Sequence, residues 1–303
     1  MMSSSWWNLM LAYTLMVYSI LFFVGLIQNT LLLAMTVRSR RLRSMFNYLV
    51  AFAAASHLLW FTGIPVLVVS TTVSIPKNLC SFLSIPSALG AFSSCATPFV
   101  LTIDRVIATS IPNEYKMLKF REVSYIAFLL CFPVFYAAWI IFFAALQLGN
   151  SDDAVICVLP EAVGSPYLLF EMTSISFSMI ILPLIWFISH RMRSMEYDSS
   201  NTALVRALII STAISYFGIL SSHCILRFAH SLRSSDSYEL CRMCAGIVCF
   251  IAQCGVMPAY CYYVRDYRLA FWELFGGRPV NPPDTSTRIL EPRNQYAMRN
   301  VFH

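Results

Sequence analysis

Charged residues are scarce in this chain. Lys, Arg, Asp and Glu together make up 12% of the 303 residues, whereas hydrophobic residues make up 58%. A soluble globular domain carries about 25% charged residues, because its surface must stay hydrated. The composition therefore excludes an ordinary soluble globule and indicates a protein whose surface lies largely in a lipid bilayer.

The sequence also lacks residue patterns that are typical of enzymes, metal-binding proteins, transporters and channels. No His, Asp, Glu or Cys residues cluster at the spacing that a metal site or a catalytic centre requires. We therefore expect no enzyme activity, no metal and no cofactor. The apolar segments contain very few ionisable residues and show no internal repeat. Both features disfavour a transporter or a ligand-gated channel, which stay as the alternative class.

Seven apolar runs have the length that crosses the hydrocarbon core of a bilayer. They predict an all-α membrane protein, a seven-transmembrane helix bundle with a short amphipathic C-terminal helix. The first run is too long for the core of a signal peptide and lacks a basic leader, so it should remain as an anchor behind an extracellular N-terminus of residues 1–8. The predicted membrane helices are 9–37, 45–70, 80–110, 122–146, 166–190, 202–229 and 240–263.

Positive charge is distributed unevenly between the segments that join these helices. With the N-terminus outside, most Lys and Arg residues fall on the inner side, in keeping with the positive-inside rule. We predict a multi-pass protein of the plasma membrane with its C-terminus in the cytoplasm. Basic inner loops facing anionic lipid account for the net charge of +6, so nucleic acid is not expected as a partner. The outer Lys and Arg residues are Lys77, Arg227, Arg233 and Arg242.

Most of the ten cysteines lie inside predicted helices, where a thiol behaves as a small apolar group. Two are placed differently, because Cys80 begins the third helix at the outer face and Cys157 lies in the outer segment between helices four and five. Both therefore lie in an oxidising compartment. We predict a disulfide between them, which ties that segment over the mouth of the bundle. A second bridge among Cys224, Cys241 and Cys244 stays open.

The inner end of the third helix carries a recognisable motif. The order Cys80, Asp104-Arg105, Pro112 and Tyr115 resembles the third helix and second inner loop of rhodopsin-like G-protein-coupled receptors. The resemblance covers nearly the whole chain and implies a receptor that binds an extracellular ligand and activates a heterotrimeric G-protein. The residues to which it assigns coupling and activation are Asp104, Arg105, Pro112, Tyr115, Pro258 and Tyr260.

The chain also departs from that family. It has His57 where the family usually has a buried aspartate, so the sodium-binding carboxylate is missing, and Met257 precedes Pro258 where the family has asparagine. The short N-terminus and the 266–271 segment look similar to the serpentine chemoreceptors of nematodes, which implies a chemosensory function. No acidic residue falls at the inner end of helix six to restrain Arg105, so we expect signalling without ligand.

Four polar residues fall at middle depth on helices one, two, three and seven, where unpaired polar groups are costly. They are Asn29, His57, Ser94 and Gln253. One interpretation is a structural hydrogen-bond network that joins four helices. The other makes His57 an element that titrates, because imidazole changes its charge near neutral pH. Both interpretations stay open.

The outer half of the bundle should hold the ligand. Ser87 stands where amine receptors of this family keep an aspartate, so the resemblance disfavours a cationic amine and favours a small neutral or weakly acidic molecule. A peptide ligand, bound with help from the outer stretch 147–165, is the alternative and would imply a neuropeptide-type receptor. The predicted ligand contacts are Ser87, Ala91, Glu171, Ser174, Ser178, His223, Ile247 and Ile251.

The C-terminal part divides into two predicted segments. Residues 265–275 interleave aromatic and charged side chains, which suits an amphipathic helix lying in the membrane surface in contact with lipid. Residues 276–303 are rich in proline and predict a disordered cytoplasmic tail. Thr285, Ser286 and Thr287 in this tail can accept phosphate and recruit an arrestin-like partner.

Overall fold

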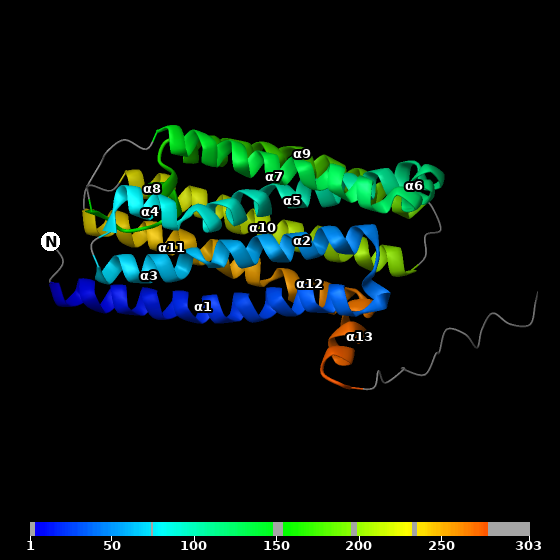
Figure 1. Cartoon of the computed structure of the whole chain (residues 1–303), viewed down its shortest axis with the longest axis horizontal. Coiled ribbons are helices and arrows are strands. Elements are labelled where there is room, and N and C mark those ends of the chain that lie inside the picture. The colour runs from blue at the N-terminus through cyan, green and yellow to red at the C-terminus, as the bar shows by residue number, and fades with distance from the viewer. Residues whose placement is uncertain (1–3, 74, 148–153, 195–198, 232–234, 278–303) are drawn as a thin grey trace, which may run out of the picture.

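The computed structural model describes residues 4–73, 75–147, 154–194, 199–231 and 235–277. In this part of the chain seven helical segments are long and apolar enough to cross a membrane, and they lie side by side along the long axis of the molecule (Figure 1). The predicted all-α seven-helix bundle is confirmed. The segments are Asn8–Arg38, Met45–Thr72, Ile85–Ser110, Glu122–Leu146, Pro166–Arg191, Thr202–Ala229 and Ser237–Tyr263.

Two of these segments, Met45–Thr72 and Ser237–Tyr263, consist of two helices each, and two short strands pair outside the seven segments. Strand β1 (Ile75–Pro76) runs antiparallel to β2 (Ala154–Val155). The helices are α1 (Ser4–Arg38), η1 (Arg40–Leu42), α2 (Met45–Phe61), α3 (Gly63–Thr72), α4 (Lys77–Leu83), α5 (Ile85–Ser110), α6 (Pro112–Leu118), η2 (Lys119–Arg121), α7 (Glu122–Leu146), α8 (Leu159–Val163), α9 (Pro166–Ser194), α10 (Ser199–His230), α11 (Ser235–Cys254), α12 (Val256–Tyr263) and α13 (Arg265–Leu274).

Proline explains where helices are interrupted. The third membrane helix was expected from residue 80, but α5 begins at Ile85 and the preceding turns form the separate helix α4. Pro86, which has no backbone N–H, is the second residue of α5, and the first turn of a helix is where proline is favoured. In the last membrane segment Pro258 leaves the carbonyl of Cys254 without its helical donor, and α11 ends at that residue.

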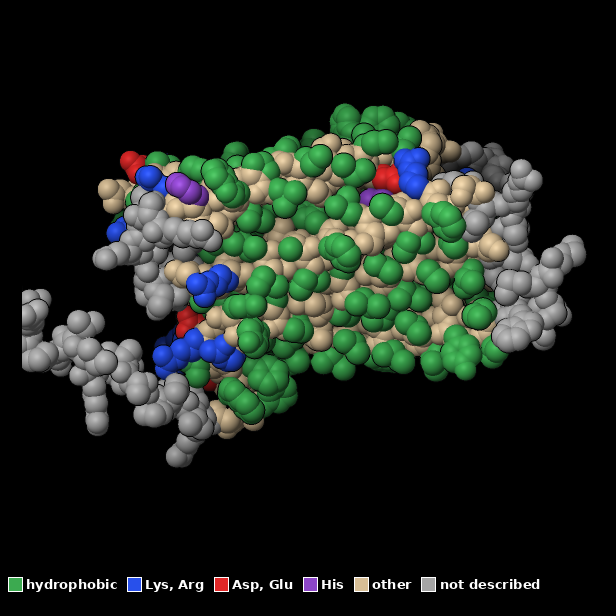
Figure 2. Space-filling model, turned by 180° about the vertical axis from the view of Figure 1, so that it is seen from behind, with side chains coloured by type: hydrophobic (Ala, Val, Ile, Leu, Met, Phe, Trp, Pro, Cys, Tyr) green, Lys and Arg blue, Asp and Glu red, His purple; other side chains and the backbone are tan. Residues whose placement is uncertain are grey.

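The outside of the bundle is apolar along its length. Large side chains such as Phe135, Leu182 and Phe217 are more than half exposed. Figure 2 shows one face, on which hydrophobic side chains cover the middle and the charged ones lie toward the two ends. A surface of this kind is stable only against lipid. We call the two ends the Cys80 end and the Arg105 end.

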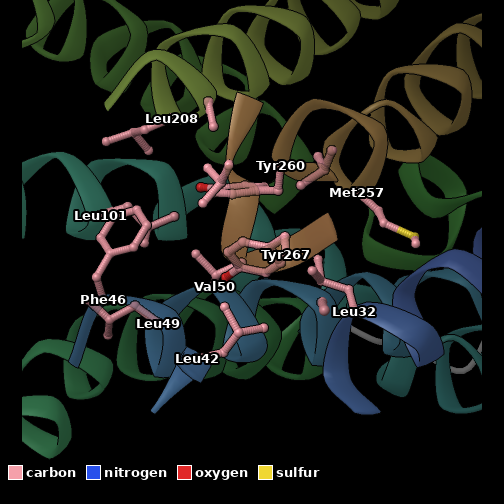
Figure 3. Packing of buried hydrophobic residues seen from close by; sticks show 14 of the residues in the cluster. Leu32, Leu42, Phe46, Leu49, Val50, Leu101, Leu208, Met257, Tyr260 and Tyr267 are labelled. Carbon is pink, nitrogen blue, oxygen red and sulfur yellow. The ribbon is translucent and has the colours of Figure 1, made fainter. Parts of the chain in front are cut away.

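A core of buried residues fills the Arg105 end, where α13 turns back against the bundle (Figures 1 and 3). The Tyr260 and Tyr267 rings lie 5.2 Å apart, and the Tyr267 hydroxyl donates to Asn47 Oδ1 at 2.9 Å. Burial raises the pKa of Tyr267, so this hydroxyl stays a neutral donor. These contacts fix α13 to α2 and α12.

At the Cys80 end, α4, α8 and the β1–β2 pair lie close together and cover the helices beneath them (Figure 1). Cys80 and Cys157 form a disulfide, as the sequence predicts, with their Cα atoms 5.5 Å apart. The Ser81 hydroxyl donates to the Ala162 carbonyl at 2.7 Å, which adds a second link between α4 and α8. The loop after β2 is thereby held over the bundle.

Close approach of α2 and α5 depends on Gly90. A Cβ atom at this position would lie 2.3 Å from the Trp60 nitrogen and 2.4 Å from the Ser56 oxygen, which are backbone atoms that cannot turn away. Gly90→Ala should therefore lower the stability by about 1–3 kcal/mol. The measurement is thermal unfolding of the purified protein in detergent. Gly255→Ala is the control, because its nearest neighbour lies 3.1 Å away on a side chain, and an equal loss in both variants would contradict the packing argument.

Candidate functional site

The Asp104–Arg105 pair lies buried at the end of α5. Asp104 is fully buried and Arg105 is 8% exposed. Arg105 Nε donates to Asp104 Oδ2 at 2.9 Å, and Nη2 donates to the same oxygen at 2.5 Å. Opposite charges attract strongly where water is excluded, and either one alone would be costly there. The two side chains therefore form one unit.

Aromatic side chains from three other helices enclose this pair. Tyr115 of α6 donates to Asp104 Oδ1 at 3.0 Å and accepts from Arg105 Nη2 at 2.8 Å, while Tyr125 of α7 donates to Asp104 Oδ1 at 3.1 Å. The Arg105 guanidinium lies 4.5 Å from the centre of the Phe46 ring of α2. Burial raises the pKa of Tyr115, so its hydroxyl keeps the proton that it donates.

The other predicted coupling residues, Pro112, Tyr260 and Pro258, make no hydrogen bond to this ion pair among the described residues. Pro112 is the first residue of α6, where its missing N–H costs no hydrogen bond, and Tyr115 follows within one turn. The buried Tyr260 ring of α12 lies 6.5 Å from the Phe46 ring, so Phe46 is in contact with both Tyr260 and the buried ion pair. Pro258 is on the exposed side of α12.

The middle of the bundle brings together only part of the predicted polar set. His57 Nδ1 and Asn29 Oδ1 lie 3.2 Å apart and join α2 to α1. Ser94 instead donates to the Ala91 carbonyl of its own helix, and Gln253 is buried with its Oε1 unpartnered. Within the described residues, the predicted set is thus a pair joining two helices and not a four-helix network.

A cavity opens among the helices at the Cys80 end and holds about 810 Å³ of space, part of it open to solvent. Two of the predicted ligand contacts, Ser87 and His223, line it. The full lining is Tyr18, Trp60, Gly63, Ile64, Leu67, Ser84, Ser87, Cys157, Val158, Leu159, Pro160, Tyr167, Phe170, Ile219, Ser222, His223, Leu226, Arg242, Ala245, Gly246, Cys249 and Phe250.

The other predicted contacts lie elsewhere. Ser174 and Ser178 are buried and donate to backbone carbonyls of their own helix. Ile251 is 54% exposed on the outside of the bundle, because the neighbouring Phe250 takes the inward position. Ile251 therefore points away from the bundle, whereas Ser174 and Ser178 point into it but lie outside the cavity. The six predicted residues that do not line the cavity are Ala91, Glu171, Ser174, Ser178, Ile247 and Ile251.

Glu171 takes part in a separate ionic contact beside the cavity. Arg227 binds its carboxylate with both Nε, at 3.1 Å, and Nη2, at 2.6 Å, and His223 Nδ1 lies 3.7 Å from Glu171 Oε1. The predicted grouping of these three residues near the outer ends of helices five and six is thus present. Of the three, His223 alone lines the cavity.

Sequence reasoning missed the charged residue in the cavity wall. Arg242 of α11 is 5% exposed, and its Nη1 contacts Glu161 of α8 at 3.1 Å and Glu239 at 2.9 Å. Glu239 precedes Arg242 by three residues, a helical spacing that signals an ion pair in the sequence. Tyr125 was also missed, and nothing in the sequence distinguishes it from the other tyrosines of the chain.

The hydrogen bond from Tyr125 to Asp104 can be removed without disturbing the packing of the ring. Tyr125→Phe should lower the stability by roughly 1.5–3 kcal/mol, because the bond is made to a buried charge. Thermal unfolding of the purified protein measures the change. Tyr13→Phe, which alters a 58% exposed tyrosine, should have almost no effect. Equal unfolding temperatures for the Tyr125 variant and the wild type would contradict the contribution of this bond.

Comparison with known proteins identifies the family. Residues 22–275 match the family model of the serpentine type seven-transmembrane G-protein-coupled chemoreceptors Srsx. The chain is also similar to the C-C chemokine receptor 1-like protein 1 of Mus musculus, at 22% identity over 284 residues that cover 85% of this chain and 78% of that protein. These matches confirm the prediction of a G-protein-coupled receptor. They indicate a multi-pass membrane receptor rather than an enzyme. The chain belongs to the Srsx family of serpentine G-protein-coupled chemoreceptors.

Proposed function

We propose that the Cys80 end faces the outside of the cell, that a small molecule binds in its cavity, and that the Arg105 end activates a heterotrimeric G-protein at the plasma membrane. The disulfide supports this orientation, because such bonds persist in oxidising compartments. The exposed arginines at the other end, such as Arg38 and Arg40, agree with a cytoplasmic location.

The buried Asp104–Arg105 unit is the observation that carries the proposal. A buried ion pair contributes little to stability, because removing two charges from water costs about as much as their attraction returns. Such a pair is suited to a switch, since it is held in one state and can be exchanged for another partner in a second. We infer that Arg105 leaves Asp104 in the active state and contacts the G-protein.

Helix α10 offers the physical link between the two ends. Ile219, Ser222 and His223 of this helix line the outer cavity. About two turns along the same helix, Ser211 and Ser215 line a second cavity, which also contacts Tyr260. A ligand that binds better when α10 has moved would shift the population toward that state and change the surroundings of Arg105.

Contacts with lipid and with a desensitising partner are further parts of the proposal. Trp272 and Phe275 at the end of α13 are more than half exposed beside its charged residues, which suits a helix in the membrane surface. The tail residues proposed to recruit an arrestin-like partner, Thr285, Ser286 and Thr287, lie outside the described residues, as does most of the predicted tail.

The coupling proposal is tested by G-protein dissociation in cells that express the wild type, Arg105→Ala or Arg38→Ala, assayed with a panel of Gα subunits. Arg38 is an exposed arginine at the same end and serves as the matched control. An N-terminal tag detected on unpermeabilised cells measures surface expression, so that cells with equal expression can be compared. The same signal tests whether the N-terminus lies outside the cell.

The wild type should signal without added ligand, because Asp104 is the only acidic partner that the described residues give Arg105. Arg105→Ala should abolish this output, and Arg38→Ala should keep it. A wild-type output equal to that of Arg105→Ala for every Gα subunit would contradict ligand-free signalling. If Arg105→Ala responded to an agonist as fully as the wild type does, the proposal that Arg105 couples the receptor to the G-protein would be wrong.

A further inference from the structure

We propose that the cavity at the Cys80 end selects a small organic anion, whose carboxylate binds Arg242 and His223 while its apolar body lies among the aromatic side chains. The inference rests on the proposed function in placing the ligand in this cavity. It adds the chemical class of the ligand and the residues that recognise it.

Arg242 has a free edge. Its side chain is 3% exposed, and among the described residues Glu161 and Glu239 bind Nη1 alone, while the guanidinium carbon lies 5.1 Å from the centre of the Tyr238 ring. Nε and Nη2 are buried and have no hydrogen-bond partner, although Arg242 lines the cavity. Buried N–H groups are nearly always paired in folded proteins, and an unpaired one costs free energy. The parallel N–H groups of Nε and Nη2 match the two oxygens of a carboxylate.

The two glutamates do not take the place of such a ligand. Their side chains are 36% and 24% exposed, whereas that of Arg242 is 3% exposed. Neither of them lines the cavity. They hold the guanidinium by its opposite side and leave Nε and Nη2 available. Arg242 therefore keeps two N–H donors that neither glutamate binds.

His223 adds a second polar group to the same cavity. Both of its ring nitrogens are buried without a hydrogen-bond partner, and its charged neighbour Glu171 is already bound by Arg227 through two hydrogen bonds. Imidazole carries an N–H donor in its neutral as well as its charged form. His223 on α10 and Arg242 on α11 can thus bind one anionic group between two adjacent helices.

The remaining lining determines what the rest of the ligand must be. Tyr18, Trp60, Tyr167, Phe170 and Phe250 give the cavity aromatic walls. An inorganic anion would leave these walls uncovered. An organic acid with a ring or a branched alkyl group covers them and also reaches Arg242.

The test measures binding to the purified full-length receptor in detergent as a rise in its unfolding temperature. The probes are phenylacetate, cyclohexylacetate and indole-3-acetate, each paired with its primary amide, with sodium sulfate as the inorganic anion. At least one acid should raise the unfolding temperature further as its concentration increases, whereas its amide and sulfate should not. If no acid did so, or if the amides acted as well as the acids, the proposal would be overturned.

Two variants assign the effect to Arg242. Arg242→Gln should weaken binding of the active acid by roughly tenfold to a hundredfold, since hydrogen bonds to a charged group are lost. Lys77→Gln removes a basic residue at the same end that does not line the cavity and should bind as the wild type does. If Arg242→Gln does not fold, the triple variant Arg242→Gln, Glu161→Gln, Glu239→Gln removes the whole ion cluster and should lose binding too. Unchanged affinity in the variant that folds would overturn the proposal.

This assay is independent of the G-protein. Acid binding without any Arg105-dependent signalling would support the ligand class and contradict the coupling proposal. Arg105-dependent signalling in a receptor that no acid stabilises would support the coupling proposal and overturn the ligand class.

Discussion

Buried side chains fill most of the interior of the bundle, and this sets the cost of every charge buried there. Both ends nonetheless contain a buried arginine that contacts carboxylates. Arg105 has Asp104 and Tyr115 as hydrogen-bond partners and the Phe46 ring as a further contact, and its acid is itself bound by Tyr125. Within the part of the chain that the structure describes, Arg242 is paired with carboxylates through Nη1 alone. Arg105 is bound on several sides by the protein, whereas Arg242 keeps two N–H groups without a partner. We therefore propose coupling for Arg105 and ligand binding for Arg242.

The helices between the two ends make a connection possible. Lipid offers no hydrogen-bond partners, so the backbone must satisfy itself within helices, and these act as stiff elements along the whole membrane. Helix α10 contributes side chains to both cavities, and Phe46 contacts Tyr260 as well as Arg105. We infer that a small displacement of α10 at the Cys80 end reaches the surroundings of Arg105 through these packed side chains.

The number and rough extent of the membrane helices could be predicted from the sequence, because each apolar run must be long enough to cross a bilayer. The same holds for the Cys80–Cys157 bridge, which follows from two cysteines placed on one side. The rotation of each helix could not be predicted, since in lipid both of its faces are apolar. Ile251 and Phe250 are equally hydrophobic, yet only Phe250 faces the cavity. The position of Arg242 in the cavity wall was also missed. Its contact with Glu161 of α8 joins segments that are far apart in the sequence.

The measurement that tests the central claim most directly is ligand-free G-protein activation by Asp104→Asn beside the wild type, at equal surface expression. The neutral amide keeps the shape of Asp104 and removes the charge that holds Arg105. The account predicts higher activation in the variant, because Arg105 is then free to meet the G-protein. Activation equal to or below that of the wild type would contradict the claim that Asp104 restrains Arg105.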